Sequence, residues 1–177
     1  MTLRDTLIGI HAAGGTVAFG AGVILVRQAA GRGPGRLPDM AYLAGMVVLA
    51  ATAAALTGTD WAGLGPAPRA VFAALTGFAV VLAGLAGRAG RLLRARAPGW
   101  RPRFTEAVGF TLIALFDGFV IIAALDLGAP GWAVAVAAVA AVLAGRRVIQ
   151  RASARAARSQ DQPAQPRTEA QSSLSGG

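Results

Sequence analysis

The stretch Phe104 to Leu125, FTEAVGFTLIALFDGFVIIAAL, is apolar for almost its whole length and, apart from Glu106 near its start, carries one carboxylate, Asp117, near its middle. About 20 apolar residues at a rise of roughly 1.5 Å each are enough to cross the hydrocarbon core of a bilayer. A charge at that depth costs about 2.5 to 3.5 kcal/mol on insertion scales, so it should face the protein interior or a wet cavity. The stretch therefore predicts a membrane helix with one polar group that needs an explanation.

Four more apolar segments accompany this one. Hydrophobic residues make up 55% of the chain and charged residues only 14%, against about 25% in an ordinary soluble domain. The apolar mass is mostly small, and small residues suit helices that pack closely inside lipid. We therefore expect an all-α fold, a polytopic bundle of five transmembrane helices within residues 1–147, in the inner or plasma membrane. The predicted spans cover residues 7–26, 40–58, 70–87, 107–125 and 130–145.

The arginines predict the orientation of these spans. All 17 basic residues are arginine, and they concentrate in the first and third connections and after the fifth span. The second connection has only Arg69 and the fourth has none. Because cytoplasmic loops are enriched in Arg and Lys, we expect the N-terminus outside and the C-terminus in the cytoplasm. If the short fifth segment did not span, four helices would remain. The net charge of +9 is spread between apolar runs, so we expect lipid and not nucleic acid as the counterpart.

The polar segments carry three further expectations. In the third connection, Arg88 to Arg103, we expect a loop retained in the cytoplasm by its arginines; the alternative is that Leu92, Leu93 and Trp100 dip into the lipid interface while the arginines bind anionic headgroups. Thr105 and Glu106 have the character of a helix end. The C-terminal tail, residues 148–177, should leave the membrane as a basic helix and become disordered from Ser159 onward, where apolar content almost disappears.

Asp117 has two readings. As a functional group it would carry a proton or bind a cation on a transport path. As a structural group it would be a protonated carboxyl hydrogen-bonded to a neighbouring helix, for instance to Thr16, Thr52, Thr76 or His11. The other predicted spans have no acidic residue deep inside them, which weakens the case for a proton relay.

His11, the only histidine, lies five residues into the first span. It could bind haem, bind a metal or titrate with Asp117, or it could bond a neighbouring helix as a polar interfacial residue. Bis-histidine haem needs two imidazoles, so one chain supplies half of such a site. A zinc site needs three or four ligands, and the sequence offers no such cluster. We expect no metal and no cofactor.

Gly14, Ala18 and Gly22 repeat every four residues in the first span. This pattern lets another helix backbone approach closely, either within the chain or from a partner. Without cysteine, disulfides and thiolate metal sites are excluded. The Gly-rich GRGPG at Gly31 to Gly35 lacks the Lys-Ser/Thr of a phosphate-binding loop. We therefore expect a protein that is not an enzyme.

The stretch HAAGGTVAFGAGVI resembles the opening helix of an uncharacterised bacterial multi-pass family, a domain of unknown function with a His-x3-Gly first helix. The second helix, GRLPDMAYLAGMVVLAATA, and the third, VFAALTGFAVVLAGLAGRAG, are similar to that family too. The resemblance covers residues 8–125 and rests on His11, Gly15, Gly22 and Gly35. The family's usual His in the first basic turn is missing here, which puts a shared cofactor site in doubt. The expectation is a non-enzymatic subunit or stabiliser of a membrane assembly, with a carrier using Asp117 or a haem protein using His11 as alternatives.

Overall fold

The computed structural model describes residues 2–31, 35–128 and 130–161, and every regular element in these ranges is helical. A 3-10 turn, η1, separates the second and third helices. The elements in chain order are α1 (Leu3–Ala29), α2 (Arg36–Asp60), η1 (Trp61–Gly63), α3 (Pro66–Ala95), α4 (Trp100–Asp126) and α5 (Gly131–Asp161). The all-α prediction is confirmed.

Four helical segments in the described part of the chain are long and apolar enough to cross a membrane. They are Leu3–Ala29, Arg36–Gly63, Pro68–Ala95 and Trp100–Ile121. Each overlaps one of the first four predicted spans, which confirms that the chain has the helices of a membrane protein. The first three extend beyond the predicted run at both ends, because polar residues continue the helix; the fourth starts earlier, at Trp100, and its apolar segment ends at Ile121.

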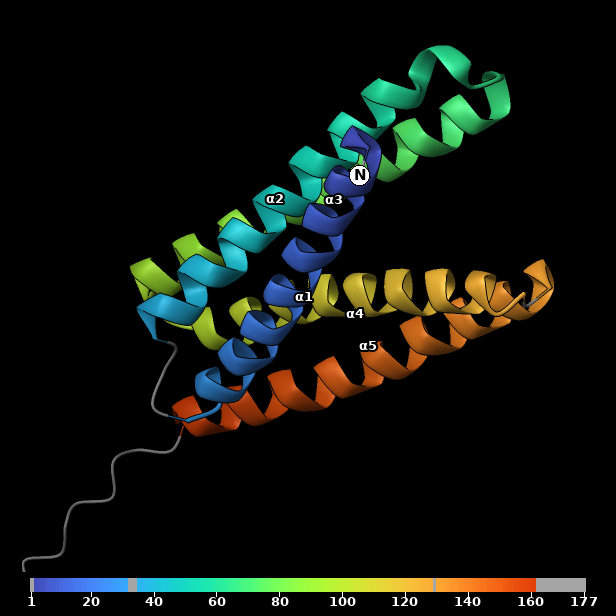
Figure 1. Ribbon diagram of the computed structural model, residues 1–177. Coiled ribbons are helices and arrows are strands. Elements are labelled where there is room, and N and C mark those ends of the chain that lie inside the picture. The colour runs from blue at the N-terminus through green and yellow to red at the C-terminus, as the bar shows by residue number, and fades with distance from the viewer. Residues whose placement is uncertain (1, 32–34, 129, 162–177) are drawn as a thin grey trace, which may run out of the picture.

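The helices form two hairpins with α1 between them (Figure 1). α1 packs along α2 and also touches α4, while α2 contacts α3, α3 contacts α4, and α4 lies along α5. The α2–α3 and α4–α5 turns lie on one side of the bundle, at the right of Figure 1. The ends of α1, α3 and α5 and the starts of α2 and α4 lie on the opposite side. The arginine-rich segments of the sequence therefore gather at one end of the molecule, called here the arginine-rich end.

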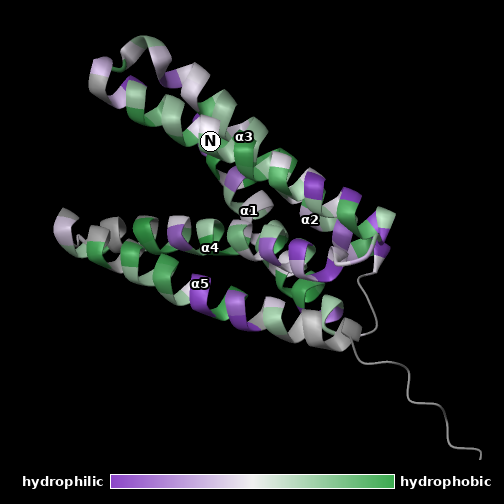
Figure 2. Cartoon of the chain, turned by 180° about the vertical axis from the view of Figure 1, so that it is seen from behind, coloured by the Kyte–Doolittle hydropathy of each residue, from purple (hydrophilic) through white to green (hydrophobic). Residues whose placement is uncertain are grey.

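The helices are largely apolar, as their green colour in Figure 2 shows, and many large hydrophobic side chains are exposed. On α3, Ala79, Leu82 and Ala86 are buried, whereas Val71 and Leu75 are each 57% exposed. The core between α1, α2 and α4 contains the fully buried side chains Tyr42, Phe104, Leu25, Met46, Val108 and Thr111. A bundle with a small core and a bare apolar surface suits lipid and not water, because large exposed apolar patches are rare on soluble proteins.

The third connection differs from our expectation. α3 continues to Ala95 and α4 begins at Trp100, so most of the arginine-rich stretch is helical. Leu93 and Trp100 are buried in the core and do not dip into lipid, and the Trp100 ring packs edge-on against Phe104. The prediction was wrong because arginine is a good helix former whose long stem keeps the charge at the surface while the helix packs.

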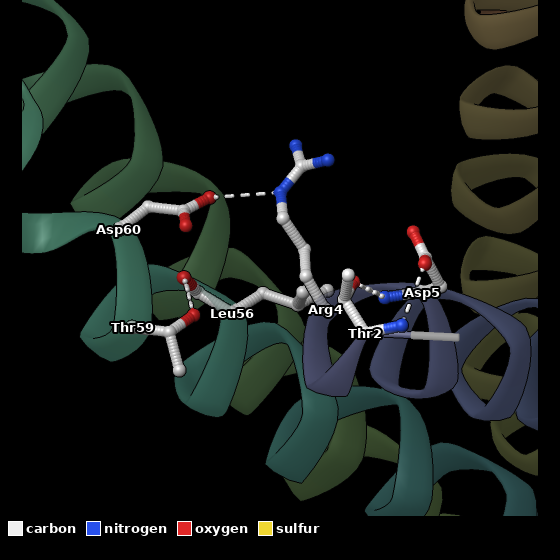
Figure 3. A network of polar contacts seen from close by, with 6 residues as sticks. All are labelled: Thr2, Arg4, Asp5, Leu56, Thr59 and Asp60. Atoms are coloured by element: carbon white, nitrogen blue, oxygen red, sulfur yellow. Dashed lines mark hydrogen bonds and ion pairs between the residues drawn. The ribbon is translucent and has the colours of Figure 1, made fainter.

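Other helix ends also differ from the predicted ones. Thr105 lies inside α4, more than one turn after its start, so it does not mark a helix end. At the far end of the bundle α1 starts with a capping box, in which Thr2 and Asp5 exchange two hydrogen bonds. Arg4, in the same turn, forms an ion pair with Asp60 at the end of α2, with 3.3 Å between Arg4 Nε and Asp60 Oδ2 (Figure 3). This contact holds the first turn of α1 beside the last turn of α2.

The C-terminal helix follows the sequence-based expectation only in part. α5 continues beyond Arg146 as a basic helix, as predicted, and it includes Ser159 and ends at Asp161. The predicted disorder therefore does not begin at Ser159. The rest of that prediction, residues 162–177, lies outside the described residues.

Candidate functional site

Asp117 lies in α4 with its side chain partly buried and its Oδ1 fully enclosed. Among the described residues, Oδ1 has no hydrogen-bond partner. Two of the hydroxyls that we predicted as structural partners of Asp117, those of Thr16 and Thr76, are hydrogen-bonded to other groups. Thr16 donates to the Ala12 carbonyl at 2.9 Å, and Thr57 and Thr76 bond each other across α2 and α3 at 2.7 Å.

The face of α4 that carries Asp117 is set by its register against α5. A Cβ on Gly109 would lie 2.6 Å from Ile149 Cγ1, and a Cβ on Gly145 would meet the side chain of Ile113. Each helix therefore places an isoleucine in the notch that a glycine leaves on the other. Because Gly109, Ile113 and Asp117 are spaced four apart, they share one face of α4. Asp117 thus lies on the α5 side, one turn beyond the Ile113 contact.

Two hydroxyls on the same interface are also unpaired. Thr105 precedes Gly109 by one turn, and Ser153 follows Ile149 by one turn, so the antiparallel register places them at the same level. Within the described residues, the buried side-chain oxygens without a hydrogen-bond partner are Thr105 Oγ1, Asp117 Oδ1 and Ser153 Oγ. Sequence reasoning missed both hydroxyls. The four-residue spacing from Thr105 to Asp117 predicts that these residues share one helix face, but only the register with α5 shows that this face contacts α5.

His11 lies on a different interface. Its Nδ1 is 3.0 Å from Thr52 Oγ1, and the Thr52 hydroxyl lies 2.8 Å from the Val48 carbonyl. The Thr52 hydroxyl also lies 3.1 Å from the Leu49 carbonyl, and its bond to Nδ1 runs in the direction set by the histidine tautomer. This geometry matches the expectation of a histidine bonded to a neighbouring helix.

The structure does not bring His11 and Asp117 together. Phe19 of α1 stacks on Phe116 at 6.5 Å and meets Phe119 edge-on at the same distance. These rings occupy the α1 side of α4, whereas Asp117 lies on the α5 side. The two residues therefore form separate sites. In the described part of the chain, no group of three or more His, Cys, Asp or Glu side chains could hold a metal ion.

Two polar pairs near the arginine-rich end were not anticipated. Tyr42 of α2 and Thr111 of α4 form a short hydrogen bond, and Thr111 also donates to the Val108 carbonyl at 2.8 Å. Asp39, in the first turn of α2, is almost enclosed, and its Oδ2 lies 3.6 Å from Arg94 Nη1 of α3. Tyr42 is the only tyrosine and could have been flagged, but pairing across three helices is not visible in sequence.

Gly14, Ala18 and Gly22 are all buried and face other helices of the chain. A Cβ on Gly45 of α2 would lie 2.8 Å from the Gly14 carbonyl oxygen and 2.9 Å from the Ala18 nitrogen. The α1 and α2 backbones are therefore in direct contact at this point. Gly22, one turn further, accommodates Leu112 of α4. These three small residues therefore allow close packing between helices of the same chain.

Comparison with known proteins adds no relative: no protein-family model, curated protein or solved structure matches the chain. The resemblance to the uncharacterised bacterial multi-pass family therefore stays a hypothesis. What can be argued about function comes from the side chains described above.

Proposed function

We propose that the chain crosses the inner or plasma membrane five times, with its N-terminus outside and its C-terminus in the cytoplasm. The arginine distribution supports this orientation, because the arginine-rich ends of α1, α3 and α5 share one side of the bundle (Figure 1). The pairing of α5 with α4 along its length supports a fifth span. Reporter fusions after residue 161 and after Arg69 test this: the first should be cytoplasmic and the second external. A cytoplasmic signal from both would contradict the topology.

We further propose that the protein is a non-enzymatic subunit or stabiliser of a larger membrane assembly. Uncovered small-residue positions carry this proposal. Cβ atoms added at Gly9 and Gly20 of α1, or at Gly77 and Gly84 of α3, would meet nothing within 4 Å. Gly77 and Gly84 lie seven residues apart and share a face opposite the buried Ala79, Leu82 and Ala86. Smooth helix faces of this kind allow another membrane helix to approach closely.

The test is a pull-down on a C-terminal tag in mild detergent, followed by mass spectrometry. We expect a stoichiometric membrane partner or a second copy of the chain. Gly77→Leu should release a partner bound at the α3 face, because the added side chain holds the helices apart. Gly58→Leu is the matched control, since Gly58 is equally uncovered but lies near the end of α2. A chain that purifies alone in every mild detergent would contradict the proposal.

The unpaired Oδ1 of Asp117 favours a second function, a proton- or cation-coupled carrier. A carboxyl group without a partner in a membrane helix is costly, and such groups mark ion and proton paths in transporters. In proteoliposomes with an internal pH-sensitive dye, the wild-type chain should dissipate an imposed pH gradient and Asp117→Asn should not. The two proteins must give the same size-exclusion profile, so that a loss of activity is not a loss of folding. Equal leakage by the two proteins would leave Asp117 without a transport role.

A further inference from the structure

The unpaired buried oxygens of the described structure lie on one interface. We call this interface the α4–α5 seam and define it by Thr105, Gly109, Ile113 and Asp117 of α4 with Gly145, Ile149 and Ser153 of α5. Most buried polar groups in native proteins are hydrogen-bonded, and exceptions often indicate a missing water, ion or functional role. The α1–α2 and α2–α3 interfaces follow the rule, because His11 bonds Thr52 and Thr57 bonds Thr76.

We propose that the α4–α5 seam is a water-accessible path along which protons reach Asp117 from the arginine-rich end. Thr105 and Ser153 lie at the same level toward that end and give the mouth of the path two hydroxyls for water. Asp117 lies about 18 Å further along the helix axis. There its carboxylate oxygen takes a proton from a hydronium ion, leaving water, and returns it by the reverse step. The inference rests on the carrier function proposed above.

The chemistry around Asp117 favours a proton over a metal cation. Ca²⁺ takes six to eight oxygen ligands and Mg²⁺ an octahedral set. Asp117 is the only acidic residue within the apolar run from Ala107 to Leu125, and the described residues include no group of acidic side chains suited to a metal ion. A proton needs only one carboxylate oxygen. The enclosed, unpartnered Oδ1 meets this requirement.

Few charged groups lie level with Asp117, whereas Arg103 of α4 and Arg151 of α5, both exposed, flank the mouth hydroxyls. α5 contributes Arg146 and Arg147, which follow Gly145 and are exposed; Arg146 lies about 7 Å nearer the arginine-rich end than Asp117. α1 contributes His11, which is bonded to Thr52 on another interface. α3 has Arg69 near its start and Arg88, Arg91 and Arg94 toward its end, at the arginine-rich end. On α4, the nearest acidic residues are Asp126, about 14 Å away along the helix toward its end, and the exposed Glu106, about 16 Å away toward its start.

Two isoleucines close the path in this structure. Ile149 sits against Gly109 and Ile113 against Gly145, between the mouth hydroxyls and Asp117. The three atoms nearest to each added Cβ belong to the isoleucine side chain, with Cγ1 the closest in both cases. A small separation of α4 and α5 admits water past these side chains. Ile113 and Ile149 therefore act as the gate of the path.

Substituted-cysteine labelling tests the path directly. The chain has no cysteine, so each introduced thiol is the only one present. Thr105→Cys, Ser153→Cys and Asp117→Cys are reacted in membrane vesicles with a charged, membrane-impermeant methanethiosulfonate. Val17→Cys is the matched control: the contacts between α1 and α4 place Val17 level with Asp117, and it is 51% exposed on the outer surface. Thiols labelled in denaturing detergent give the total for each variant.

We expect Thr105→Cys, Ser153→Cys and Asp117→Cys to react from the arginine-rich side, each at least about tenfold faster than Val17→Cys, because only a hydrated thiolate is reactive. Ala141→Cys, one turn before Gly145 on α5, repeats the test at the level of Asp117 with the carboxyl group intact. If Asp117→Cys and Ala141→Cys are as inert as Val17→Cys, or react only from the opposite side, the proposal is wrong. Labelling does not depend on transport, so a wet seam with no proton flux would contradict the carrier function and not the path.

A second experiment tests whether Asp117 binds a proton or a metal cation. Dicyclohexylcarbodiimide modifies protonated carboxyl groups in lipid, so intact mass should show one adduct that Asp117→Asn abolishes. Thr105→Val and Ser153→Ala should slow its formation when protons are supplied only from the arginine-rich side. Thr16→Val is the control, because that hydroxyl bonds its own helix. Protection by Na⁺ at constant pH would show that a metal cation occupies the site, and would overturn the assignment to protons.

Discussion

The α1–α2 and α4–α5 interfaces are both built on glycine, but they use it differently. Gly45 brings the backbone of α2 against the Gly14 carbonyl and the Ala18 nitrogen of α1. Gly109 and Gly145 instead receive the side chains of Ile149 and Ile113. Backbone atoms at such a contact cannot move without moving the helix, whereas an isoleucine side chain can. The first interface is therefore held by backbone contact, and the second by the fit of side chains.

The two interfaces also differ in whether their buried polar groups are hydrogen-bonded. The α1–α2 interface pairs His11 with Thr52, while the α4–α5 seam leaves Thr105, Asp117 and Ser153 unpaired. An unpaired buried group costs stability, and a paired one makes a modest net contribution. The comparison indicates that one interface is arranged for stability and the other retains polar groups at a cost. Four substitutions test this difference.

Gly45→Ala should have the largest effect. Its Cβ would lie 2.8 Å and 2.9 Å from backbone atoms of α1, so the two helices must separate, with a loss of about 3 kcal/mol. We expect a lower midpoint in thermal unfolding followed by fluorescence-detected size exclusion. Gly20→Ala is the control, because nothing lies within 4 Å of that position. Equal midpoints for the two variants would remove the distinction between the interfaces.

Asp117→Leu should raise stability, by up to about 2.5 kcal/mol on insertion scales, because it removes an unpaired carboxyl group from the middle of a membrane helix. The measurement is the same unfolding midpoint, compared with Asp117→Asn. A fall in the midpoint of both variants would assign Asp117 a structural hydrogen bond and would weaken the carrier reading.

Gly109→Ala should cost less than Gly45→Ala, about 1 kcal/mol, because the three nearest atoms belong to the side chain of Ile149 and not to backbone. Ile149→Val in the same chain should recover part of the loss, and a double-mutant cycle measures this coupling. Additive effects would show that Ile149 does not occupy the notch.

Thr52→Val should have the smallest effect, about 0.6 kcal/mol, which is typical of hydrogen bonds between membrane helices. The variant removes the hydroxyl that shares a hydrogen bond with His11 Nδ1. Thr16→Val, which breaks only a bond within α1, serves as the comparison. A cost several times larger for Thr52→Val would mean that the His11–Thr52 contact, and not close backbone packing, dominates this interface.

The sequence alone determined that the chain is helical and apolar, where the first four membrane helices lie, and which residues inside them are chemically costly. These properties depend on local composition: apolar runs of sufficient length form helices, and a carboxylate stands out wherever it occurs. The same local reasoning failed between Arg88 and Arg103, because burial of Leu93 and Trp100 depends on contacts with other helices.

Only the tertiary structure decided which polar residues meet. The pairing of His11 with Thr52, and of Tyr42 with Thr111, joins residues far apart in the chain. The seam likewise depends on the register between α4 and α5, which places Ser153 level with Thr105. In apolar helices of similar composition, many registers bury similar surface, and the fit of isoleucine into glycine notches selects one. That selection leaves Asp117 facing α5 without a partner.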